Sequence, residues 1–116
     1  MATAEEHENQ AAHNHRFLGS IDRDEYPDWA ATAIFYTAVH LVQMLFVKKG
    51  GAGGSHIKRN KTLRTDCREV WKSYQPFYAF SRLSRYWCLR VSASDIPYLE
   101  RRLERVRRTI QELTAS

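Results

Sequence analysis

The longest apolar run of the sequence extends from Trp29 to Val47, and it constrains the fold more than any other feature. Apolar side chains fall on nearly every face of a helix drawn through this run, and a helix of that kind is buried at the centre of a domain. Five polar residues interrupt the run: Thr32, Tyr36, Thr37, His40 and Gln43. These interruptions make the run too polar for a membrane span. We therefore expect a buried central helix over about residues 28–49, and no membrane association.

The other segments also have helical patterns, because no Asn-Gly or Asp-Gly pair marks a hairpin and no run alternates at period two. We expect helices over about 3–18, 56–66 and 67–87, with Ser55 as an N-cap and Pro76 kinking or splitting the third of them. Asp95 is expected to cap a last helix with an apolar stripe: Leu99, Leu103, Val106, Ile110 and Leu113. The sequence predicts one all-α domain over residues 1–116, a bundle of four or five helices. A flexible glycine-rich loop lies at about 50–54, and the termini can be disordered.

Positive charge is concentrated in the second half of the chain. Residues 1–50 contain four Lys/Arg and seven Asp/Glu, whereas residues 51–116 contain fourteen and six. A basic half of this kind fits a polyanion such as RNA or DNA, and it equally fits solvated helix faces.

The cysteine and histidine patterns predict neither a disulfide nor a metal centre. Cys67 and Cys88 lack a CxxC context, and His7, His13 and His15 lack a ligand set. The N-terminus has no signal-peptide pattern. We therefore expect free thiols in the cytoplasm, no metal and no cofactor.

Two groups of polar residues are candidates for a site. His56, Arg59 and Asn60 are three and four residues apart, so a helix places them on one face. Imidazole can transfer protons near neutral pH and guanidinium binds phosphate, so the three are candidate catalytic residues. Arg82, Arg85 and Tyr86 are candidate substrate-binding residues for phosphate contact and base stacking. The alternatives are an exposed basic helix start and a pair of surface arginines.

Tyr36 and His40 form a third candidate pair, one turn apart on the central helix. A buried imidazole needs a hydrogen-bond partner, and the Tyr36 hydroxyl is within reach of His40 on a helix. A hydrogen-bonded core histidine is one interpretation. The other is that the pair supports the site by orienting residues of a neighbouring helix.

Three segments in this order resemble the HEPN superfamily (higher eukaryotes and prokaryotes nucleotide-binding), in particular its small stand-alone prokaryotic members. They are PDWAATAIFYTAVHLVQMLF, SHIKRN and WKSYQPFYAFSRLSRYW, over about residues 27–87. The resemblance implies an up-and-down helical bundle that forms homodimers. It also implies either a metal-independent ribonuclease of the toxin or defence type, or an inactive module that binds RNA or a protein partner.

The order of the candidate residues differs from the active-site pattern of that superfamily. Active members place a histidine four to six residues after an arginine, whereas here His56 precedes Arg59 and Asn60. Two hypotheses follow. The first is an RNA-binding protein, with or without ribonuclease activity, in which His56 transfers protons and Arg59 holds phosphate. The second is a helical interaction module, as in a toxin–antitoxin or defence pair.

Overall fold

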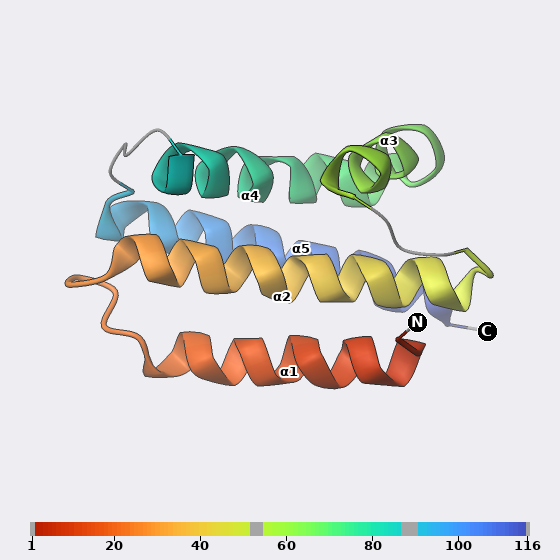
Figure 1. Cartoon of the computed structure of the whole chain (residues 1–116), viewed down its shortest axis with the longest axis horizontal. Coiled ribbons are helices and arrows are strands. Elements are labelled where there is room, and N and C mark those ends of the chain that lie inside the picture. Colours follow the sequence, from red (N-terminus) through yellow and green to blue (C-terminus); the bar gives the residue numbers. More distant parts are fainter. Residues whose placement is uncertain (1, 52–54, 87–90, 116) are drawn as a thin grey trace.

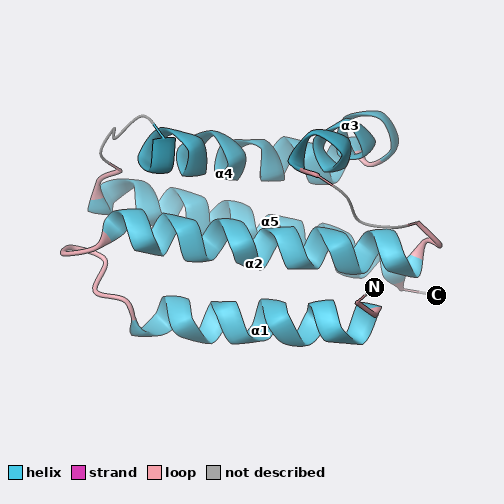
Figure 2. Ribbon diagram, in the orientation of Figure 1, coloured by secondary structure: helices cyan, strands magenta, loops and turns pink. Residues whose placement is uncertain are grey.

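The computed structural model describes residues 2–51, 55–86 and 91–115, with side chains except at 83–86, and these residues form a helical bundle. The α-helices are α1 (Ala4–Ser20), α2 (Pro27–Lys48), α3 (His56–Asp66), α4 (Arg68–Tyr86) and α5 (Ile96–Thr114), and the 3₁₀ turn η1 spans Ala93–Asp95. Figure 2 shows that the described residues contain no strand. The expectation of an all-α chain is confirmed for them.

The central helix of the bundle is α2. It lies between α1 on one side and α3 and α4 on the other, with α5 packed behind it (Figure 1). Its buried residues include Ile34, Phe35, Val42 and Leu45, each 2% exposed or less. Trp29 is the one large apolar residue of α2 that is exposed, at 58%.

By length and composition alone α2 could cross a membrane, a test that the core helix of a soluble protein also passes. In this structure 72% of its most apolar window is buried among the other helices. Helices from both halves of the chain cover α2, as the apolar run predicted.

Local sequence signals account for where the helices begin. Thr3 and Glu6 form a capping box at the start of α1, and Ser55 accepts a hydrogen bond from the Lys58 amide at the start of α3. Pro27 occupies the first turn of α2, where its missing amide proton costs no hydrogen bond. The cap at Ser55 fixes His56 as the first residue of α3.

Pro76 lies inside α4 and does not split it. Asp95 is the N-cap residue of α5, as expected, but its side chain makes no capping hydrogen bond to that helix. Its carboxylate instead accepts from the Ser92 amide at 2.9 Å, in the capping box of the 3₁₀ turn. The expected extent of the apolar stripe of α5 was wrong. Leu113 is 44% exposed, so the apolar stripe of α5 ends at Ile110. The expected loop at 50–54 falls largely on residues 52–54, outside the described part of the chain.

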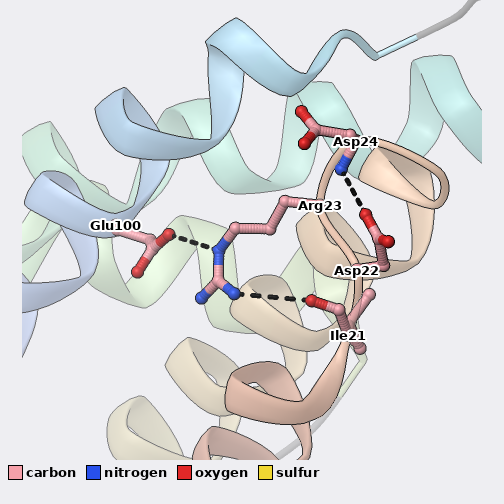
Figure 3. A network of polar contacts seen from close by, with 5 residues as sticks. All are labelled: Ile21, Asp22, Arg23, Asp24 and Glu100. Atoms are coloured by element: carbon pink, nitrogen blue, oxygen red, sulfur yellow. Dashed lines mark hydrogen bonds and ion pairs between the residues drawn. The ribbon is translucent and has the colours of Figure 1, made fainter.

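A polar network joins the α1–α2 connection to α5 (Figure 3). Arg23 donates to the Glu100 carboxylate at 2.9 Å and to the Ile21 carbonyl at 3.5 Å. Asp22 accepts from the amides of Asp24 and Glu25, which folds the connection into a turn. About a third of each side chain in the Arg23–Glu100 pair is exposed, so the pair contributes at most about 1 kcal/mol.

Candidate functional site

The centre of the candidate site is a direct contact within α3. Arg59 Nη1 lies 2.8 Å from His56 Nδ1, one helical turn away. Arginine can only donate, so Nδ1 accepts and the proton of this imidazole is on Nε2. His56 itself is exposed, whereas Arg59 is only 6% exposed. The contact therefore places a buried cation directly behind a solvent-facing imidazole.

Burial distinguishes this cluster from an ordinary basic helix start. Arg59 and Asn60 are both buried, although most arginines and asparagines lie in solvent. The Asn60 Oδ1 atom is buried and meets no hydrogen-bond partner among the described residues. Burying a charge and an amide costs free energy unless contacts within the protein compensate for the lost water.

Aromatic rings from α2 and α4 surround the imidazole. The ring of Phe35 lies 5.6 Å from that of His56, and the ring of Tyr78 lies 5.8 Å from it. Arg82 donates to the Tyr78 hydroxyl at 3.1 Å, and its guanidinium lies 5.7 Å from the centre of the Tyr78 ring. Helices α2, α3 and α4 therefore bring His56, Arg59 and Arg82 into one cluster lined by aromatic rings.

Tyr74 lies at the buried end of this cluster. Burial raises the pKa of Tyr74 to about 12, although the nearby positive charge of Arg59 acts to lower it. Arg59 lowers the pKa of Tyr74 by its charge and by hydrogen bonding, but the effect of burial is larger. The phenol is thus neutral at physiological pH.

The raised pKa predicts a loss of stability in alkali. In the unfolded chain Tyr74 ionises near pH 10, whereas in the folded chain it ionises near 12. The free energy of unfolding therefore decreases as pH rises from 10 to 12, by about 2–3 kcal/mol from this residue. Urea denaturation across this range should show a smaller decrease for Tyr74→Phe. The exposed Tyr98→Phe variant serves as the control, and a decrease equal in both variants would contradict the assignment.

His40 contacts α1 through a second histidine. Its Nδ1 lies 3.1 Å from the Nδ1 of His7, so one of the two nitrogens donates and the other accepts. Burial lowers the pKa of His40, and the charges of His7 and Arg59 lower it further. The sequence indicated Tyr36 as the partner of His40; the hydrogen-bonding contact is instead with His7.

The lowered pKa of His40 predicts that acid destabilises the fold. The unfolded chain takes up this proton near pH 6.5 and the folded chain only at lower pH, so stability is lost as pH decreases below about 6.5. A His40→Gln variant should lose less melting temperature than the wild type between about pH 7.5 and about pH 5. His13→Gln, which removes an exposed histidine of α1, should behave as the wild type does. An unchanged pH dependence in His40→Gln would contradict the prediction.

The structure brings together only some of the expected site residues. His56, Arg59 and Asn60 lie on α3, and Arg82 joins the cluster from α4. The side chains of Arg85 and Tyr86 lie outside the described residues. The ring of Tyr36 packs edge-on against Phe35 at 5.1 Å, so Tyr36 reaches the cluster through one intervening ring.

Sequence reasoning missed four aromatic residues around the cluster and at its edge: Phe35, Tyr74, Tyr78 and His7. The i,i+4 spacing of Tyr74, Tyr78 and Arg82 on one helix was the available signal for two of them. Nothing in the sequence places His7 opposite His40, because that contact depends on how α1 packs on α2.

A second basic surface lies between α4 and α5. A hollow of about 340 Å³ there is lined by four cationic and two acidic residues, namely Lys72, Arg102, Arg105, Arg108, Glu69 and Glu112. Lys72 pairs with Glu69 at 3.2 Å, and Arg102 donates to the Lys72 carbonyl. This mixture of charges is typical of a solvated helix face, in contrast to the buried arginine on α3.

Comparisons with protein-family models, with curated proteins and with solved structures gave no match to this chain. The assignment of a function therefore depends on the residues and their geometry.

Proposed function

We propose that this chain is an RNA-binding protein whose α2–α3–α4 cluster, defined by His56, Arg59 and Arg82, contacts phosphate. The observation that carries the proposal is the 2.8 Å contact between the buried Arg59 guanidinium and the exposed His56 imidazole. The HEPN-like up-and-down bundle and the homodimer that the resemblance implies belong to the same proposal, as does the cytoplasmic location that the cysteine pattern predicts.

The donors of this cluster suit a phosphodiester. Because Nδ1 of His56 accepts from Arg59, the ring proton of this exposed side chain is on Nε2, which is a hydrogen-bond donor. Arg82 adds an exposed guanidinium next to the Tyr78 ring. Cationic donors beside aromatic rings combine phosphate contacts with base stacking.

The same geometry favours binding over cleavage in the observed state. Metal-independent RNA cleavage forms a bond between the 2′-oxygen and phosphorus and breaks the bond to the 5′-oxygen, which takes up a proton. A histidine that acts as the base needs a nitrogen free to accept the 2′-OH proton. In His56 one nitrogen accepts from Arg59 and the other already carries a proton, so cleavage requires Arg59 to release Nδ1 first.

A gel-shift experiment in EDTA with labelled single-stranded RNA tests the proposal. We expect the wild type to bind, and His56→Ala to bind about 3- to 10-fold more weakly, the effect of losing one hydrogen bond. His13→Ala removes an exposed imidazole elsewhere and should bind as the wild type does. The same gels report any cleavage to a 2′,3′-cyclic phosphate. No shift with the wild type would overturn the proposal and favour the protein-binding alternative.

A further inference from the structure

A groove between α1 and α2 differs in chemical character from the proposed phosphate site. Its volume is about 330 Å³, within the usual range of small-molecule pockets. The residues that give it its chemistry are Gln10, Asn14, Phe17, Trp29, Tyr36 and His40. None of the residues that line it has a formal charge at neutral pH, because the pKa of His40 is lowered.

Two large aromatic side chains of this groove are exposed. Phe17 of α1 is 55% exposed and Trp29 of α2 is 58% exposed, although phenylalanine is among the residue types most often buried and tryptophan is highly buried on average. Flat aromatic surfaces bind other flat rings by stacking. The side-chain amides of Gln10 and Asn14, which bond each other at 2.9 Å, add donors and acceptors at the same wall. An uncharged planar ring with polar edges is the ligand that fits this lining.

Helix α2 separates the groove from the phosphate site, and packed aromatic rings link the two. Figure 1 shows α2 between α1, which forms the other wall of the groove, and α3, which carries His56 and Arg59. Tyr36 lines the groove and packs on Phe35, and Phe35 in turn packs on His56. The positive charge of Arg59 lowers the pKa of His40, which also lines the groove. The uncharged groove and the cationic site therefore lie on two sides of α2 and interact through it.

We propose that the α1–α2 groove holds an unpaired nucleobase, stacked on Trp29 and Phe17, of the strand whose phosphate lies at Arg59 and His56. This inference rests on the proposed RNA-binding function and adds to it a substrate class. A base can enter the groove only when it is free of its own helix, so the protein selects single strands over duplexes.

Binding of three ligands of equal length tests the proposal by fluorescence anisotropy. They are a single-stranded RNA, the matching RNA duplex and an abasic ribose-phosphate strand. We expect the wild type to bind the single strand most tightly. Trp29→Ala should lose about 5- to 100-fold in affinity for that ligand alone, with Phe17→Ala changing in the same direction. Tyr98→Ala, which removes an exposed aromatic ring of α5, should leave all three affinities unchanged.

The outcomes separate this inference from the function on which it rests. Wild-type protein that binds none of the three ligands overturns both. Equal binding of all three, with Trp29→Ala like the wild type, leaves RNA binding intact and overturns the base groove. Sedimentation of the same variants measures their oligomeric state and tests whether a second copy of the chain covers the groove. If Trp29→Ala turns a dimer into a monomer with unchanged affinity for the single strand, a second copy of the chain covers the groove and the inference is overturned.

Discussion

Replacing Phe35 with alanine is expected to lower the free energy of unfolding by about 3–5 kcal/mol, the usual cost of removing a buried phenylalanine. Phe35 is 2% exposed and its ring packs on Tyr36, His56, Tyr74 and Tyr78. It therefore connects α2 to both α3 and α4. Domains of this size have total stabilities of about 5–15 kcal/mol, so the loss is a large fraction of the whole.

Urea denaturation followed by circular dichroism measures this loss. Phe35→Leu provides a milder variant if the alanine variant does not fold, and it should lose less stability because it leaves a smaller cavity. The matched control is Phe17→Ala, whose exposed ring should change the stability by only about 0.5 kcal/mol. Equal effects at Phe35 and Phe17 would show that Phe35 is not the residue that joins the three helices.

Replacing Arg59 with methionine is expected to weaken RNA binding about 10- to 100-fold, because hydrogen bonds to charged groups contribute about 1.5–3 kcal/mol each. The slope of log affinity against log salt should decrease by about 1, as for the loss of one phosphate contact. The pKa of His40 should rise, because the charge of Arg59 lowers it in the wild type. Methionine is chosen because it fills much of the buried space without a charge.

Arg64→Met is the matched control for this variant, since it removes the same charge from the same helix. Arg64 is exposed and lies over the Trp71 ring at 5.6 Å, away from the His56 contact. The Arg64→Met variant should change RNA affinity only through the overall electrostatic field of the protein, and by less than Arg59→Met does. Equal losses of RNA affinity in the two variants would show that α3 contributes only non-specific positive charge.

Much of the fold followed from local signals. The apolar run marked α2 as the central helix, and Ser55 marked the start of α3. Two details depend on tertiary or neighbouring contacts. Asp95 is the N-cap residue of α5, but its side chain bonds the Ser92 amide instead of the amides of α5. Leu113 lies beyond the last buried residue of α5, so the apolar stripe ends earlier than expected.

The candidate site was predictable only along single helices. The spacing of His56 and Arg59 correctly indicated one face, and the structure places them in contact at 2.8 Å. The spacing could not indicate that Arg59 and Asn60 are buried while His56 is exposed, because burial depends on how α3 packs on α4. The contacts of Phe35 with His56 and of His7 with His40 join helices that are distant in the sequence, and no local pattern encodes them.

The most direct test of the proposed RNA site is a ¹H–¹⁵N NMR titration of the wild type with single-stranded RNA. The binding account predicts that the largest shifts fall on the first turns of α3, from His56 to Asn60, and on Tyr78 and Arg82 of α4. The backbone of α5 from Arg101 to Arg108 should shift less. Shifts confined to the arginines of α5, or no shifts at all, would contradict the claim that the α2–α3–α4 cluster binds RNA.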